Sequence, residues 1–167
     1  MLLDDWKVCP RCGNQLTRGE GSVACAVCGF VFYAHSAVTA SALPEDDDGR
    51  VLLARRAHEP SRGMWDVVGG FVEEGEHPLD GLHREVREET GVGFHVRRFM
   101  GIWMGEYFGR STLNLFWTGR IVDGEPSPKD DVAELRWFAP DTLPASRELA
   151  FEGLIEAVLA AWREEHA

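Results

Sequence analysis

The chain has 167 residues, of which 44% are hydrophobic and 27% are charged, and its formal net charge is −11. This length fits one globular domain with at most a small appendage, and the apolar fraction excludes bulk disorder. The excess of acid, 28 Asp and Glu against 17 Lys and Arg, repels polyanions at long range, so long nucleic acid is disfavoured as a partner. A small phosphate ester held through a divalent cation remains compatible with this charge.

The sequence shows no sign of a membrane segment or a secretory signal. No apolar run approaches the roughly 20 residues that span a bilayer, so we expect no membrane partner. Asp4 and Asp5 stand where a secretory signal would carry basic residues, and no long apolar stretch follows them. We therefore expect a cytoplasmic location.

All four cysteines lie within the first thirty residues, as two Cys-x-x-Cys pairs separated by twelve residues. Two such pairs can present four sulfurs to one tetrahedral ion, and a glycine after each second cysteine permits the turn this requires. A disulfide is disfavoured in a reducing compartment, and neither pair opens a helix after a strand as a redox pair would. The spacing predicts a small zinc ribbon over residues 1–30, in which Zn²⁺ is structural and is held by Cys9, Cys12, Cys25 and Cys28.

Residues 31–167 are expected to form a second, larger domain. Its expected strands are rich in β-branched and aromatic residues and are bounded by turn residues. They cover residues 30–43, 51–56, 65–72, 94–104, 113–122 and 135–138.

Two helices are expected in the same domain. The first covers residues 78–90, with proline in its first turn and Gly91 just past its end. The second covers residues 146–165, where apolar side chains from Phe151 to Trp162 recur at helical spacing. Strands, a helix, further strands and a final helix predict an α/β fold with a mixed sheet sandwiched by helices.

Three carboxylates of the first helix lie beside its apolar stripe. Glu85, Glu88 and Glu89 span about 100° of the helix surface, next to the sector that should face the sheet. Glu85 and Glu89 are four residues apart and repel each other, and partial burial would strengthen that repulsion. A hard divalent cation with oxygen ligands relieves the conflict. The alternative, a solvated acidic face, does not explain why these residues border the apolar stripe.

The carboxylates also belong to a longer motif. From Gly70, five residues precede Glu76 and seven more precede Arg84, after which the chain reads Arg-Glu-Val-x-Glu-Glu-x-Gly-Val. This pattern resembles the Nudix hydrolase box at every defined position over residues 70–92. The chain has Val68 where the family usually has proline. The resemblance extends from about residue 30 to the C-terminus, and a zinc ribbon before a Nudix domain resembles the NADH pyrophosphatase subgroup.

The resemblance implies a Nudix-type α/β/α sandwich and a pyrophosphohydrolase. The expected reaction is the Mg²⁺-dependent (or Mn²⁺-dependent) hydrolysis of a nucleoside diphosphate linked to another moiety. Water attacks one phosphorus while the cation neutralises charge. The implied site residues are the Mg²⁺ ligands Glu85, Glu88 and Glu89, Arg84 as the group that holds carboxylates such as Glu76, and Gly69 and Gly70, where the backbone approaches the metal.

The resemblance leaves the general base and the substrate open. The base is either Glu88 or an acid of a later loop, for which Asp130, Asp131 and Glu134 are the candidates. The NADH-cleaving subgroup carries a downstream motif rich in Ser, Gln, Pro and Trp or Phe, and residues 101–109 lack it. ADP-ribose, NADH and nucleotide sugars therefore remain alternative substrates, as does the diphosphate of an RNA cap.

Two other functions compete with catalysis. The first is a non-catalytic, nucleotide-binding regulatory module on a Nudix fold, which the intact glutamates disfavour. The second is a zinc-ribbon adaptor for nucleic acid or protein. Residues 1–30 carry three acids and three bases, so they attract nucleic acid weakly. A homodimer is an expectation from the family alone, because no local feature demands one.

Overall fold

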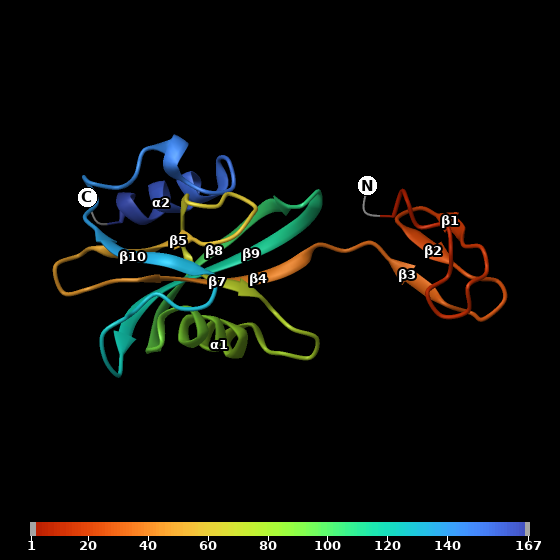
Figure 1. Ribbon diagram of the computed structural model, residues 1–167, viewed down its shortest axis with the longest axis horizontal. Helices are drawn as coiled ribbons and strands as arrows, with labels where there is room; N and C mark the ends of the chain where they lie inside the picture. The colour runs from red at the N-terminus through yellow and green to blue at the C-terminus, as the bar shows by residue number, and fades with distance from the viewer. Residues whose placement is uncertain (1–2, 166–167) are drawn as a thin grey trace.

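The structure is a computed structural model that describes residues 3–165. An N-terminal sheet in the order β1-β2-β3 is joined by residues 34–36 to a larger α/β part (Figure 1). Its antiparallel strands are β1 (Thr17–Gly19), β2 (Ser22–Ala24) and β3 (Val31–Tyr33). The predicted division after residue 30 falls between β2 and β3, and the pairing of Ser22 with Tyr33 carries the ribbon's sheet beyond it. The apolar run that begins at Phe30 suits either sheet, so composition did not separate them.

The larger part contains a mixed four-stranded sheet in the order β7-β4-β9-β8. These strands are β4 (Ala37–Pro44), β7 (Val68–Phe71), β8 (Gly93–Tyr107) and β9 (Arg110–Val122). Strands β4 and β9 run parallel, and the other neighbours are antiparallel. The predicted mixed sheet is confirmed.

A second sheet, in the order β10-β5-β6, completes the sandwich. Its strands are β5 (Val51–Arg56), β6 (Trp65–Asp66) and β10 (Val132–Phe138). The segment expected as one strand over residues 65–72 divides at Val67, because β6 pairs with β5 whereas β7 pairs with β4. The division carries Gly69 and Gly70 onto the four-stranded sheet, next to the first helix.

Helix α1 (Pro78–Thr90) has the predicted bounds and covers one face of the four-stranded sheet (Figure 1). The His77 ring accepts a hydrogen bond from the Leu79 amide at 3.2 Å and caps the N-terminus. Gly91, in the left-handed conformation at φ 77°, ends the helix. Leu82 and Val86 are fully buried against strand residues that include Val68. This packing fixes which side of α1 the carboxylates occupy.

Helix α2 (Leu154–Glu164) lies on the opposite side of the sheet from α1 (Figure 1). The prediction of one helix over residues 146–165 was wrong at its start, because the chain forms a 3₁₀ turn at Ser146–Glu148 and enters α2 only at Leu154. Phe151 at φ 51° and Gly153 at φ 80° are left-handed and cannot continue a right-handed helix. Phe151 therefore leaves the apolar stripe of α2. None of the helices in residues 3–165 is both long and apolar enough to cross a membrane.

Candidate active site and metal cluster

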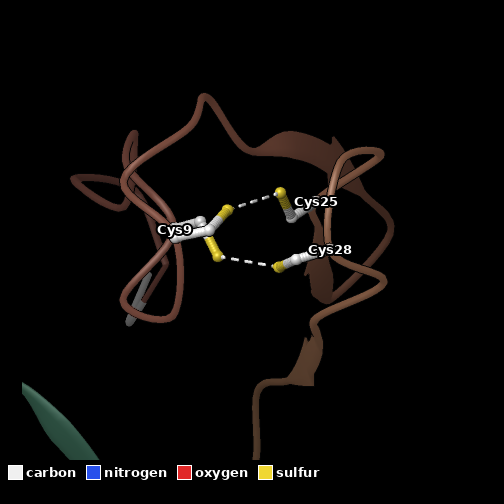
Figure 2. A group of neighbouring side chains, drawn as sticks. Cys9, Cys25 and Cys28 are labelled. Atoms are coloured by element: carbon white, nitrogen blue, oxygen red, sulfur yellow. Dashed lines mark hydrogen bonds between the residues drawn. The ribbon is translucent and has the colours of Figure 1, made fainter.

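The four cysteines gather at one end of the ribbon, where Figure 2 shows sulfurs facing one another from two loops. The Sγ atoms of Cys9 and Cys28 are 3.6 Å apart, those of Cys12 and Cys25 are 3.5 Å apart, and all four lie within 4.8 Å. A disulfide needs about 2.05 Å, whereas sulfurs at about 2.3 Å from a tetrahedral ion lie about 3.8 Å from one another. The cluster therefore fits a zinc ribbon.

The amide of Asn14 favours the ionised form of one of these thiols. Its Nδ2 donates to Cys12 Sγ at 3.3 Å. This hydrogen bond is the main reason that the pKa of Cys12 falls to about 6. A thiolate at neutral pH is the form that ligates metal.

Arg84 ties together the carboxylates of the box. Its Nε and Nη2 donate to the two oxygens of Glu76 at 2.9 and 3.0 Å. Its Nη1 donates to Glu85 at 2.8 Å and to Glu88 at 3.0 Å. Hydrogen bonds from this guanidinium lower the pKa of Glu76 to about 2. Arg84 thus fastens the loop before α1 to the carboxylate face of the helix, the arrangement that its proposed role requires.

Glu89 is the most enclosed carboxylate of the box. Its side chain is buried and accepts one hydrogen bond, from the Gly69 amide at 2.9 Å. Burial raises the pKa of Glu89 well above its usual value, and the nearby charges of Asp66 and Glu85 raise it further. Burial likewise raises the pKa of Glu85. Glu85 has Arg84 beside it, whereas no ion pair holds Glu89 within residues 3–165. A bound cation would supply the positive charge that keeps Glu89 ionised.

Two glycines let the backbone lie close to the carboxylates of Glu85 and Glu76. A Cβ on Gly70 would stand 2.6 Å from the Glu85 carboxyl carbon. A Cβ on Gly81, inside α1, would stand 2.7 Å from Oε2 of Glu76. Side chains at these positions would displace two of the three carboxylates that Arg84 holds. Contact with Glu76 therefore explains why α1 keeps a glycine at position 81 despite its cost to helix stability.

The box forms one wall of a cleft of about 360 Å³. Eight acids and two arginines line it. Both arginines are already paired, Arg84 with the box and Arg56 with Asp66 at 3.0 Å. An anionic substrate therefore meets a surplus of negative charge that only bound cations can offset. The acids are Asp66, Glu73, Glu85, Glu88, Glu89, Glu106, Asp130 and Asp131.

The three acids considered as a later-loop general base do not all lie at the cleft. Asp130 and Asp131 line the cleft. Glu134 instead forms ion pairs with Arg55 and Arg136 and is absent from the cleft lining. The geometry therefore leaves Glu88, Asp130 and Asp131 as candidates.

The box carboxylates do not by themselves form a compact set of ligands. Within residues 3–165, the four cysteines are the only group of three or more His, Cys, Asp or Glu side chains whose ligand atoms all lie within 4.8 Å of one another. Arg84 and the Gly69 amide hold the box carboxylates toward protein partners. Their hard oxygen donors are nevertheless the kind that Mg²⁺ takes, usually through one or two carboxylates together with substrate phosphates.

Sequence reasoning missed Phe151, Thr39 and Asn114, all of which line the cleft. Phe71, Tyr107 and Phe151 form an aromatic wall, with ring centroids 5.2 Å apart for the first pair and 5.9 Å for the second. Thr39 and Asn114, on β4 and β9, line the sheet side of the cleft, here called its floor. A signal existed for the floor, since polar residues alternate with apolar ones in Thr-Ala-Ser and Thr-Leu-Asn. No local signal pointed to Phe151, because its spacing matched the helix that follows it.

The comparisons with known proteins define the family. A model of the NUDIX domain matches residues 35–158, and the chain belongs to this family of Nudix hydrolases. The chain is 31% identical over 159 residues to the NAD-capped RNA hydrolase NudC of Stutzerimonas stutzeri, covering 92% of this chain and 56% of that protein. It is 31% identical over 126 residues to the ADP-ribose pyrophosphatase of Methanocaldococcus jannaschii, covering 74% of this chain and 72% of that protein. The chain thus spans little more than half the length of the NudC relative.

A solved Nudix hydrolase from Nitrosomonas europaea has a TM-score of 0.80 and 26% identity, and the match covers 96% of this chain and 92% of that protein. Coverage of this extent reaches into the N-terminal cysteine segment. The family and the fold expected from the sequence are confirmed.

Proposed function

We propose that this protein hydrolyses the diphosphate of a nucleoside diphosphate joined to a second moiety, such as ADP-ribose, NADH or a nucleotide sugar, with Mg²⁺ or Mn²⁺ as cofactor. The observation that carries the proposal is the position of the box. Glu85, Glu88 and Glu89 line a cleft whose surplus of negative charge calls for cations. An ADP-ribose pyrophosphatase among the relatives supports the same substrate class.

The residues of the cleft have distinct parts in this reaction. Glu85, Glu88 and Glu89 would hold the divalent cation, which when bound neutralises the phosphate oxygens and polarises water. Arg84 keeps Glu85 and Glu88 in position through its hydrogen bonds. A cleft carboxylate, from Glu88, Asp130 or Asp131, accepts a proton from the attacking water.

The atoms of the hydrolysis balance without another reactant. The water oxygen forms a bond to one phosphorus, and the bond from that phosphorus to the bridging oxygen breaks. The bridging oxygen leaves with the other phosphate. The products are a nucleoside monophosphate and the phosphate of the second moiety.

The zinc ribbon would stabilise the N-terminal segment rather than take part in hydrolysis. We propose Zn²⁺ as its ion, because four thiolates leave no open ligand position for substrate. The short β1-β2-β3 sheet has few buried apolar residues, so bound metal would supply much of its folding energy.

A substrate panel tests the proposed function. Purified protein is incubated with Mg²⁺ and, separately, with ADP-ribose, NADH, nucleotide sugars, dinucleoside polyphosphates and NAD-capped RNA, and released nucleoside monophosphate is measured. We expect turnover of at least one small substrate, its loss with a chelator, and its loss in Glu89→Gln. Binding of a nucleotide by calorimetry with no turnover in the whole panel would instead establish a non-catalytic module.

A further inference from the structure

A row of polar side chains occupies the sheet face that lines the cleft. Thr39 lies opposite Asn114 in the parallel pairing of β4 with β9. Ser41 lies two residues after Thr39 on β4, and Thr112 lies two residues before Asn114 on β9, so both are on the same face. All four residues line the cleft, and Ser41, Asn114 and Thr112 are at most 6% exposed. The opposite face of β4 carries alanine against α1. A buried sheet normally places apolar residues on both faces, so this row, here called the polar strip, is shaped for a polar ligand.

Hydrogen bonds within the polar strip fix which of its groups donate and which accept. Asn114 Nδ2 donates to the Trp103 carbonyl at 3.0 Å and to Thr112 Oγ1 at 3.0 Å. Because a carbonyl oxygen only accepts, the amide nitrogen must face it, and Asn114 Oδ1 must face Thr39. The Thr39 hydroxyl donates its only proton to that oxygen at 2.8 Å. Thr39 therefore offers the cleft an acceptor and no donor.

Ser41 supplies the complementary group. Its side chain is 6% exposed, and its hydroxyl has no hydrogen-bond partner within residues 3–165. No fully buried side-chain oxygen or nitrogen in residues 3–165 lacks a hydrogen-bond partner, so this unpaired hydroxyl keeps access to the cleft, where an entering group can bond to it. Ser41 pairs with Gly69, whose amide holds Glu89, so this free hydroxyl lies at the carboxylate end of the strip.

We propose that the polar strip is a sugar subsite that binds the ribose of the nucleoside and selects it over 2′-deoxyribose. The inference rests on the proposed function. A phosphate oxygen can only accept and cannot satisfy Thr39, whereas a sugar hydroxyl both donates and accepts. The two hydroxyls stand about 7 Å apart, two residues along one strand, so they suit a group of sugar size rather than a single atom.

The order of groups along the cleft agrees with this assignment. Ser41 lies beside the glycines at the carboxylate wall, and Thr39 pairs with Phe71 of the aromatic wall. A ligand that lies along the strip would therefore place its diphosphate at the box, its sugar over the hydroxyls and its base against the rings. Aromatic faces accept any nucleobase by stacking, so the sugar rather than the base would carry the hydrogen-bond recognition.

The test uses two substrates that differ at one hydroxyl. The ratio of kcat/KM is measured for ADP-ribose and for its analogue built on 2′-deoxyadenosine. We expect the wild-type protein to favour the ribose substrate about tenfold, the value of one well-placed hydrogen bond. Thr39→Val should reduce the ratio to about one, and Thr39→Ser should restore it. Thr118→Val is the control, because Thr118 is a buried threonine of β9 that does not line the cleft, and it should keep the wild-type ratio.

Two outcomes would overturn the sugar subsite. One is a wild-type ratio near one, and the other is an equal loss of both substrates in Thr39→Val with the ratio unchanged. The same pair is also compared by calorimetry as dissociation constants. Absence of turnover refutes the proposed function alone, whereas equal affinities for the two nucleotides refute the sugar subsite alone.

Discussion

Replacement of Gly70 by alanine tests whether the close approach of β7 to α1 sets the position of Glu85. The added Cβ would stand 2.6 Å from the carboxyl carbon and one oxygen of Glu85, and 2.7 Å from the other oxygen. Ordinary contact between such atoms begins near 3.4 Å, so the carboxylate must move by about 1 Å. A displacement of that size in a catalytic group can cost about 100-fold in rate, equivalent to about 2.7 kcal/mol of barrier.

The assay is kcat and KM for the best substrate of the panel with saturating Mg²⁺, together with thermal unfolding of each variant. We expect kcat of Gly70→Ala to fall about 100-fold, with the protein still folded. Gly19→Ala is the control, since its Cβ would come closer than ordinary contact only to the movable Ser22 hydroxyl of the ribbon, and it should keep wild-type kcat. In a Glu85→Ala background, Gly70→Ala should cause little further loss, because the group it displaces is already absent.

Two results would refute this reasoning. Activity of Gly70→Ala within about threefold of wild type would mean that the position of Glu85 does not depend on this contact. A full additional loss in the Glu85→Ala background would mean that the new methyl group acts on something other than Glu85. Both outcomes are independent of the substrate identity.

Three further predictions concern separate parts of the molecule. Glu89→Gln keeps the size of the side chain and removes its charge, so kcat should fall by orders of magnitude with an unchanged circular dichroism spectrum; near-normal turnover would contradict the assignment. Cys12→Ser should lower the zinc content and the melting temperature, measured by elemental analysis and calorimetry, whereas unchanged melting with no zinc would defeat the ribbon assignment. Arg84 lowers the pKa of Glu76 from 4.5 to about 2, so this pair stabilises the fold fully above pH 4.5 and loses that effect as pH falls through about 2. In urea unfolding, Glu76→Gln should therefore be less stable than wild type at pH 7, with the difference shrinking at low pH; a constant difference would contradict this linkage.

Local sequence patterns were sufficient to predict an element when residues within that element alone determine its structure. The bounds of α1 follow from proline at its start and Gly91 at its end, and the four cysteines meet because their spacing allows little else. The second helix shows the limit of such patterns. Phe151 has the spacing of a helix residue, but its left-handed backbone, next to the bridge from Leu149 to Trp65, places it outside α2.

The sequence by itself determined the family, the box of carboxylates, the cysteine cluster and the bounds of α1. Each of these depends on the spacing of residues within a short segment, which periodicity and motif reading report directly. Only the tertiary structure decided the cleft. The pairing of β4 with β9 and β7 brought Ser41, Thr39 and Asn114 onto one face beside the box. Thr39 and Asn114 are 75 residues apart in the sequence, and strand register, which no local pattern encodes, brings them together.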